Sequence, residues 1–121
     1  MRCKLFVYGT LKRGFANHFY LQDAKFLGEA RTKERYPMVA PKRSYPYLID
    51  RPGIGYHIEG ELYEIDHKIL KRIDRLEEYP LYYTRKTIVV ECCEKEHRAL
   101  CYFLARSIPL KPPFLEKFES Q

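Results

Sequence analysis

The alternation of apolar and polar residues along the chain predicts a protein built mostly from strands. Residues 5–8 form a continuous apolar run that stops at Gly9, which is typical of a short buried strand. Residues 55–65 alternate between apolar and polar side chains, which predicts a strand with one buried face. Further strands are predicted over residues 26–33, 36–40, 83–93 and 97–105, and Glu94, Lys95 and Glu96 are expected to join the last two into a hairpin.

Two predicted helices interrupt these strands. Asp66 is a typical N-cap residue, and the apolar residues that follow it at helical spacing predict a helix that ends at Glu77 or Glu78. Pro80 cannot continue that helix, and a shorter helix is predicted over residues 16–22. Many strands with few helices favour an α+β fold with a curved sheet or a small barrel.

Length and composition indicate one ordinary globular domain. The chain has 121 residues, of which 45% are hydrophobic and 31% charged, which is unlike a disordered protein. It contains no apolar run near the roughly 20 residues of a membrane-spanning helix. Its first residues become polar too quickly for a signal peptide. We therefore expect a cytoplasmic protein with no membrane partner.

The net charge of +6 is unevenly distributed. Residues 1–51 hold 11 Lys and Arg against 4 Asp and Glu, whereas residues 52–121 hold 11 against 12. Such a basic half can be a solvated surface, or it can attract an acidic small molecule, an anionic membrane surface or nucleic acid. Tyr36, Tyr45 and Tyr47 lie among the basic residues, as base-stacking side chains do. No nucleic-acid-binding motif is present, and we expect no such partner.

The cysteines and histidines do not indicate a metal site. The four Cys and four His are scattered, without a C-x-x-C pair or a zinc-binding spacing. Cys92 and Cys93 are neighbours in a predicted strand, so their side chains are expected to point to opposite faces and not to share a ligand. We expect no metal ion and no cofactor.

Candidate chemistry begins where the first strand ends. Residues 8–14, Tyr-Gly-Thr-Leu-Lys-Arg-Gly, place two glycines and a basic pair directly after a buried strand. Glycine allows a ligand to approach the backbone closely, and successive backbone N–H groups in such a loop can bind an anion. The spacing matches neither of the common phosphate-binding motifs, which favours a carboxylate ligand. An ordinary strand-to-turn junction is the alternative.

Glu77 is the candidate acid–base residue. It follows Leu70 by seven residues and Ile73 by four, so it lies within the apolar stripe of the predicted helix, while Glu78 is expected to face solvent. Burial of a carboxyl group raises its pKa toward the range that is useful for proton transfer. The alternative is a carboxylate at the helix end that pairs with a basic residue such as Arg85.

No candidate nucleophile accompanies this carboxylate. The sequence contains no G-x-S-x-G motif, and its three serines, Ser44, Ser107 and Ser120, fall in predicted loops or in the tail. A carboxylate base and an anion-binding loop without a nucleophile suit a reaction in which the substrate attacks itself.

These features together resemble the γ-glutamylcyclotransferase-like superfamily, and within it the γ-glutamylamine cyclotransferase and AIG2-like branch. Two motifs carry the resemblance: Y-G-T-L-K-R-G at residues 8–14, and D-x-x-E-x-x-P-x-x-Y-x-R from Asp74 to Arg85. Further matching residues within, between and beside them are Asn17, Tyr36, Pro37, Val39, Glu59, Gly60, Glu61, Tyr63, Asp66 and Tyr82. The resemblance extends over residues 4–105. Glu78 departs from the pattern, because many relatives have glycine there.

The resemblance implies an α+β fold, a small mixed β-barrel of about five to seven strands with two main flanking helices. We expect a single domain over residues 1–108 and a C-terminal tail over residues 109–121 that docks loosely or is mobile. The resemblance also implies an enzyme. The free α-amino group of a small-molecule γ-glutamyl substrate attacks its own γ-carbonyl, which releases 5-oxoproline and an amine.

Site residues follow from the same two motifs. The residues that match the loop whose backbone N–H groups hold the glutamyl part of the substrate are Tyr8, Gly9, Thr10 and Leu11. Glu77 matches the general acid/base, and Tyr83 and Arg85 match positions near the pocket, where a structural role is the alternative for each. The alternative function is a non-catalytic module that binds a carboxylate metabolite in the same pocket.

Overall fold

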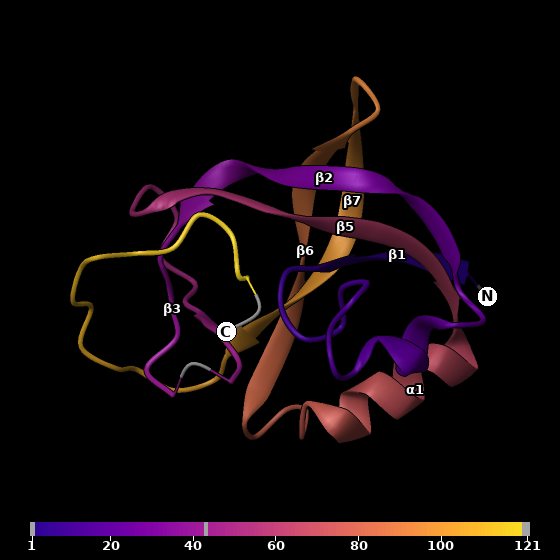
Figure 1. The fold of residues 1–121 in the computed structure, drawn as a ribbon, viewed down its shortest axis with the longest axis horizontal. Coiled ribbons are helices and arrows are strands. Elements are labelled where there is room, and N and C mark those ends of the chain that lie inside the picture. The colour runs from indigo at the N-terminus through magenta and orange to yellow at the C-terminus, as the bar shows by residue number, and fades with distance from the viewer. Residues whose placement is uncertain (1, 43, 120–121) are drawn as a thin grey trace.

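Five strands close into a barrel in the computed structural model, which describes residues 2–42 and 44–119 (Figure 1). The barrel strands are β1 (Arg2–Val7), β2 (Lys25–Tyr36), β5 (Tyr56–Asp66), β6 (Tyr83–Cys92) and β7 (Lys95–Leu104). They follow one another around the barrel in the order β1-β5-β2-β6-β7, with antiparallel neighbours. β1 and β7 close the circle as a parallel pair, with Leu5 opposite Leu100. The predicted small mixed barrel is confirmed.

The barrel interior is filled by apolar side chains. Phe6, Ile58, Leu62, Val90 and Phe103 are each at most 1% exposed. Burial of side chains of this size contributes roughly 1.5–3 kcal/mol each. The strand ends that carry the loops around the barrel opening are therefore fixed in position by the core.

The helix α1 (His67–Leu76) continues directly from β5. The Asp66 side chain accepts a hydrogen bond from Ile69 N at 2.9 Å, which caps the helix as predicted. The buried residues that face the barrel are Ile69, Leu70 and Ile73. The helix ends at Leu76 and Glu77 is its C-cap. The cap and the apolar stripe together set the direction of α1 and the position of Glu77.

The second predicted helix is a single turn of 3-10 helix, η1 (His18–Leu21). No side chain caps it, and the Asn17 side chain at its N-terminus donates to Thr10 Oγ1 at 2.9 Å. A segment of this length without a capped first turn does not extend into an α-helix. Within the described residues, α1 is therefore the only α-helix, where two were expected. No helix in this part of the chain has the length and apolar character needed to cross a membrane.

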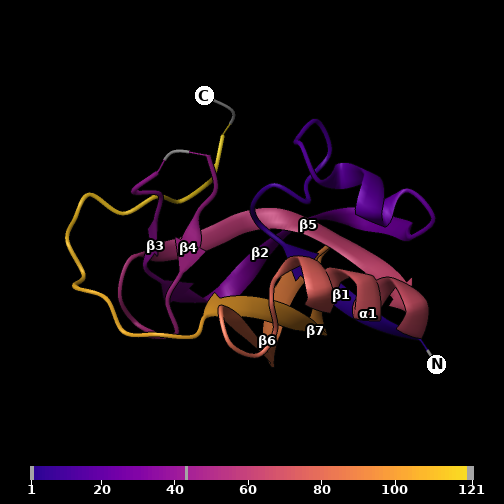
Figure 2. The same ribbon diagram turned by 90° about the horizontal axis from the view of Figure 1, so that it is seen from below.

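The region around Pro37 also differs from its prediction. β2 ends at Tyr36, and Pro37 separates it from β3 (Met38–Val39), because proline has no N–H group to donate to a sheet. β3 pairs with β4 (Tyr47–Leu48) in a small second sheet, which the sequence pattern does not indicate. In Figure 2 this pair lies toward one end of the molecule and α1 toward the other.

The strands β6 and β7 form the predicted hairpin, but its turn is shorter than expected. Cys93 and Glu94 alone make the turn, with φ values of 56° and 65°, and Lys95 already pairs with Cys92. Positive φ at both central residues gives a two-residue turn whose twist matches that of the strands. Cys93 therefore does not continue the strand, and its Sγ lies 3.5 Å from that of Cys92. The expectation that these two side chains point to opposite faces is wrong.

The chain after β7 packs back against the barrel, where it is drawn from orange to yellow in Figure 1. Leu115 N donates a hydrogen bond to Met38 O at 2.8 Å. Phe118 is 3% exposed, and its ring centroid lies 5.6 Å from that of Phe15. Leu110, Leu115 and Phe118 of the expected tail thus pack on the core, whereas Ser120 and Gln121 lie outside the described residues.

Replacing Ile73 by alanine tests whether the apolar stripe anchors α1. Ile73 is fully buried, so Ile73→Ala should lower the free energy of unfolding by about 2–5 kcal/mol. The matched control is Ile54→Ala, because Ile54 is 38% exposed, and its loss should stay below about 1 kcal/mol. Urea unfolding followed by circular dichroism measures both values. Equal losses for the two variants would contradict this packing of the helix.

Candidate active site

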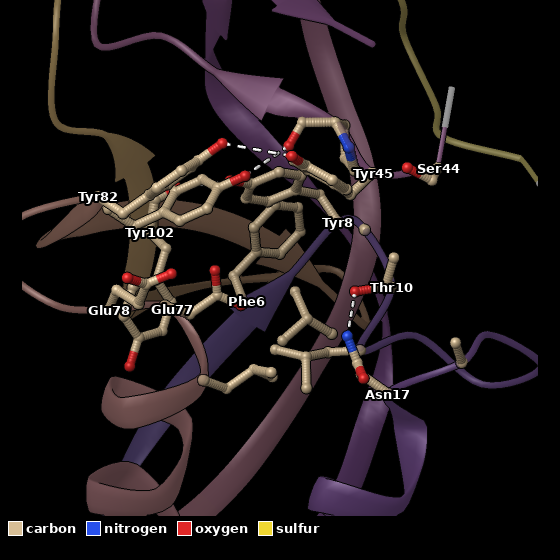
Figure 3. A pocket seen from close by; sticks show the side chains of 17 residues that line it. Phe6, Tyr8, Thr10, Asn17, Ser44, Tyr45, Glu77, Glu78, Tyr82 and Tyr102 are labelled. Atoms are coloured by element: carbon tan, nitrogen blue, oxygen red, sulfur yellow. Dashed lines mark hydrogen bonds between the residues drawn. The ribbon is translucent and has the colours of Figure 1, made fainter. Parts of the chain in front are cut away.

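A cavity of about 400 Å³ opens between the end of β1 and the C-terminal end of α1 (Figure 3). Its lining residues are Phe6, Val7, Tyr8, Gly9, Thr10, Leu11, Ala16, Asn17, Ser44, Tyr45, Pro46, Leu76, Glu77, Glu78, Tyr82, Tyr83 and Tyr102. Six of the seven predicted site residues are among them, and Arg85 is not. Of the described residues that line the cavity, only Glu77 and Glu78 carry a charge.

The loop after β1 is held in place by short hydrogen bonds. Lys12 N donates to Gly9 O at 3.1 Å, which makes a tight turn. Asn17 donates from Nδ2 to Thr10 Oγ1 and from its backbone N to Thr10 O, both at 2.9 Å (Figure 3). A Cβ atom at Gly9 would lie only 2.9 Å from Pro46 Cγ. A larger residue at this position would therefore push the loop away from its place in the cavity wall.

The basic pair of this loop binds the protein itself. Arg13 donates from its backbone N to Glu61 Oε1 at 3.0 Å and from Nε to Glu61 Oε2 at 3.2 Å. Tyr63 OH donates to the same carboxylate at 3.0 Å. Lys12 is 4% exposed, and its Nζ donates to Phe118 O at 2.6 Å. Both cations support the loop from outside the cavity, and neither lines it.

Glu77 is positioned by the end of α1. Its backbone N donates to Ile73 O at 2.9 Å, and its side chain lines the cavity on the side opposite Thr10 and Asn17 (Figure 3). Removal of the carboxyl group from water raises the pKa of Glu77 to about 7. The group can therefore take up and release a proton near neutral pH, as acid–base catalysis requires.

Arg85 is turned away from the cavity. Its guanidinium group forms a bidentate ion pair with the Asp74 carboxylate, at 2.9 and 3.1 Å. Tyr102 OH also donates to Asp74 Oδ1, at 2.6 Å. Arg85 thus pairs with Asp74 instead of Glu77, and its contacts fasten α1 to the adjoining barrel strands.

Tyr8 and Tyr83 form buried parts of the cavity wall. Tyr8 OH donates to Tyr102 O at 2.7 Å, and Tyr83 OH donates to Pro46 O at 2.9 Å. Burial is the main cause that raises the pKa of both phenols well above their usual range. Both hydroxyl groups are therefore neutral and engaged with backbone carbonyls, so these residues shape the cavity and do not exchange protons.

Tyr45 and Tyr82 also line the cavity, although neither is among the predicted site residues. Tyr82 OH lies 3.3 Å from Tyr45 OH and 2.8 Å from Tyr47 OH, so the three hydroxyl groups form one cluster. The β3–β4 sheet brings the segment around Pro46 to the start of β6, a contact between residues far apart in the chain. Tyr82 stands beside Tyr83 in the second family motif, and Tyr45 lies in the basic half of the chain, but neither signal places the two residues at one cavity.

Glu78 follows the helix in a left-handed backbone conformation, with φ of 52°. It is exposed, as expected, and it contributes to the edge of the cavity. Its carbonyl oxygen accepts from Leu81 N and Tyr82 N, both at 2.9 Å, which turns the chain toward β6. Such a conformation favours glycine, and glutamate at this position adds a second carboxylate to the cavity edge. In the described chain, no further His, Cys, Asp or Glu joins the two carboxylates to form a metal site.

The chain is similar to proteins of one family over nearly its whole length. A family model described as gamma-glutamyl cyclotransferase, AIG2-like, matches residues 5–119. A Drosophila melanogaster protein provisionally named a gamma-glutamylcyclotransferase is 42% identical over 117 residues, which are 92% of this chain and 74% of that protein. Human gamma-glutamylaminecyclotransferase is 42% identical over 96 residues, which are 74% of this chain and 63% of that protein.

Solved structures agree with the sequence comparisons. The crystal structure of an AIG2-like protein from Mus musculus matches with a TM-score of 0.90 and 34% identity, over 98% of this chain and 88% of that one. A likeness at this level shows that the barrel and α1 follow a known architecture. The chain is therefore an enzyme of the γ-glutamylcyclotransferase type, and it belongs to the gamma-glutamyl cyclotransferase, AIG2-like family.

Proposed function

We propose that the protein cyclises a γ-glutamyl amide to 5-oxoproline and releases the amine, with Glu77 as the general acid/base. The observation that carries this proposal is a carboxyl group with a pKa of about 7 that faces the glycine-containing loop across one cavity. The name of the human relative, gamma-glutamylaminecyclotransferase, supports γ-glutamyl amines as the substrate class.

The glutamyl end of such a substrate carries a carboxylate and an ammonium group, and the cavity offers a place for each. The backbone N–H groups of residues 8–11 are the donors that would hold the α-carboxylate. Asn17 fixes Thr10, and Glu61 fixes Arg13, so the loop has its shape before a substrate binds. The α-ammonium group would then lie toward Glu77, on the opposite wall.

The reaction balances with Glu77 as the only proton carrier. The Glu77 carboxylate takes a proton from the α-ammonium group, and the freed amine attacks the γ-carbonyl carbon, which forms the ring C–N bond. Glu77 returns the proton to the departing nitrogen, and the original amide C–N bond breaks. After the attack the ring nitrogen carries two protons and gives one of them to Glu77, which passes this second proton to the released amine. Of the three ammonium protons, one therefore stays on the lactam nitrogen and two leave with the amine, which departs as an ammonium ion.

Substitution of Glu77 by glutamine tests its role in proton transfer. Glutamine keeps the size of the side chain but cannot accept the ammonium proton, so kcat/KM for 5-oxoproline formation should fall by about 10²–10⁴-fold. A panel of γ-glutamyl amines that includes ε-(γ-glutamyl)lysine supplies the substrates. Glu64→Gln, on the outside of β5, is the matched control and should keep wild-type activity, and Glu78→Gln should lose less activity than Glu77→Gln.

Unchanged turnover in Glu77→Gln would contradict the proposed role of this residue. Saturable binding of the γ-glutamyl compounds without any 5-oxoproline from the wild-type protein would contradict catalysis itself. That second result, measured by calorimetry, would favour the non-catalytic carboxylate-binding module.

The pH dependence of catalysis follows from the raised pKa of Glu77. Only the ionised carboxylate can accept the ammonium proton, so kcat/KM should fall as the pH decreases through about 7. Initial rates of 5-oxoproline formation at saturating and limiting substrate, measured across this range, give the profile. An acid limb with its midpoint near the ordinary glutamate value of 4.5 would contradict the burial of this carboxyl group.

The same pKa shift predicts an opposite effect on stability. The folded protein holds the Glu77 proton up to about pH 7, whereas the unfolded chain loses it near 4.5. The resulting contribution to stability is fully present below the unfolded value and is lost as the pH rises through about 7. Glu77→Gln should therefore gain thermal stability relative to the wild type at alkaline pH more than at acid pH. Glu64→Gln should show no such trend, and a difference independent of pH in Glu77→Gln would contradict the shift.

A further inference from the structure

Cys92 and Cys93 form a thiol pair at the β6–β7 turn that the proposed reaction does not use. Their Sγ atoms are 3.5 Å apart, and both lie near the carbonyl oxygen of Leu27, at 3.8 and 3.7 Å. Neighbouring residues in an extended strand point their side chains to opposite faces. The left-handed backbone of Cys93, with φ of 56°, instead brings its sulfur to the same side as that of Cys92.

The strand β2 makes room for both sulfurs at Gly28. The register between β2 and β5 shifts between Phe26 and Gly28, and Gly28 has a φ of 148°. A Cβ atom at Gly28 would lie 2.9 Å from Cys92 Sγ and 3.1 Å from Cys93 Sγ, closer than ordinary contact allows. The absence of a side chain at Gly28 therefore permits the two sulfurs to lie side by side.

The separation of the two sulfurs suits one shared ligand atom better than a bond between them. Two sulfurs bound at about 2.3 Å to one pyramidal or tetrahedral centre, with an angle of about 90–110° between the bonds, are about 3.3–3.8 Å apart, and the separation of the pair falls within this range. A disulfide needs sulfurs about 2.05 Å apart and Cα atoms usually at least about 4.4 Å apart, whereas Cα atoms of adjacent residues are about 3.8 Å apart. A centre that bonds both sulfurs therefore requires less rearrangement than a disulfide.

The pair supplies two sulfur ligands. It therefore suits a thiophilic atom that forms three bonds and already holds a substituent in the third. No three His, Cys, Asp or Glu side chains among the described residues gather into a metal site. Burial, with a smaller effect of the hydrogen bond to Cys93, raises the pKa of the Cys92 thiol to about 11. A divalent cation would have to displace this proton, whereas an arsenoxide reacts with two thiols and releases no net proton.

We propose that Cys92 and Cys93 form a dithiol site for trivalent arsenicals that carry one organic group, independent of the cavity at Glu77. In the reaction two As–S bonds form and the arsenic–oxygen bond breaks. The oxygen leaves as water with the two thiol protons, and no atom changes its oxidation state. Cys93 is exposed and supplies the first sulfur, and Cys92 closes the ring. The turn lies at the tip of the hairpin that projects from the barrel, away from α1 (Figure 1).

Phenylarsine oxide added to the reduced full-length chain tests this site. Intact-mass spectrometry should find one phenylarsenic group per chain, which resists excess 2-mercaptoethanol and is removed by dithiothreitol. Cys93→Ser and Cys92→Ser should each lower the affinity by about 100-fold or more, because the second bond to the same arsenic atom is lost. Cys3→Ser is the matched control, since Cys3 is also a partly exposed free thiol, and it should bind as the wild type does.

Three results would overturn the proposal: a tight adduct in Cys93→Ser, loss of the adduct in Cys3→Ser, or no monothiol-resistant adduct in the wild-type protein. Circular dichroism establishes that each variant is folded, and Cys93→Ala provides a second variant at this exposed position. Cys93→Ser should also form 5-oxoproline at the wild-type rate. A changed rate would contradict the independence of this site from the cavity. If the wild-type protein and Cys93→Ser were both inactive, that result would contradict the proposed function and leave the dithiol site untouched.

Discussion

The packing of α1 on the barrel partly buries the Glu77 carboxyl group, and the chemistry proposed for the cavity depends on this contact. The Asp66 cap fixes where the helix begins, and its buried apolar face fixes how it is rotated. Together they direct the Glu77 side chain, at the C-terminal end of the helix, into the cavity. Desolvation alone raises the pKa of Glu77 to about 7. Arg85, the basic residue considered as a partner for this carboxylate, is engaged by Asp74 instead. The barrel core supplies the stability that this unfavourable burial requires.

The opposite wall of the cavity is organised by polar contacts that lie behind it. Asn17 holds Thr10, Glu61 holds Arg13, and the backbone of Phe118 holds the buried Lys12 amino group. Part of the positive charge of the N-terminal half thus has a structural role. The only charged side chains in the described cavity wall are the two carboxylates, Glu77 and Glu78. A loop fixed in this way can present backbone N–H groups to a ligand without rearrangement, which is how a small domain achieves a preorganised site. The net charge of the chain alone therefore does not predict the sign of the charge inside the cavity.

The elements that could be predicted from the sequence are those with a local, periodic signal. The stripe of α1 and its cap residue placed Glu77 inward and Glu78 outward, and the apolar runs indicated the barrel strands and the last hairpin. The turn at Cys93 could not be predicted in this way, because its left-handed backbone reflects the twist of two paired strands. The partner of Arg85 was equally hidden, since Asp74 reaches it only after the chain has turned from α1 into β6.

Tertiary contacts also explain why part of the cavity was missed. Tyr45 and Tyr82 are far apart in the sequence and meet only because the β3–β4 sheet folds Pro46 against Gly9 and Tyr83. The helix predicted over residues 16–22 is only the 3-10 turn η1, and the Asn17 side chain before it supports the loop at Thr10. Residues that serve the site thus override local preference, and such conflicts mark functional regions in a sequence.

A ¹³C-NMR titration of the Glu77 side-chain carboxyl carbon tests the central claim most directly. It follows this one group in the intact protein and needs no substrate. The only substitutions required are those that assign the resonance. A midpoint near pH 7 is the result expected from a carboxyl group that the helix and barrel have removed from water. A midpoint near 4.5, the ordinary value for glutamate, would show a hydrated carboxylate and would contradict this account of the site.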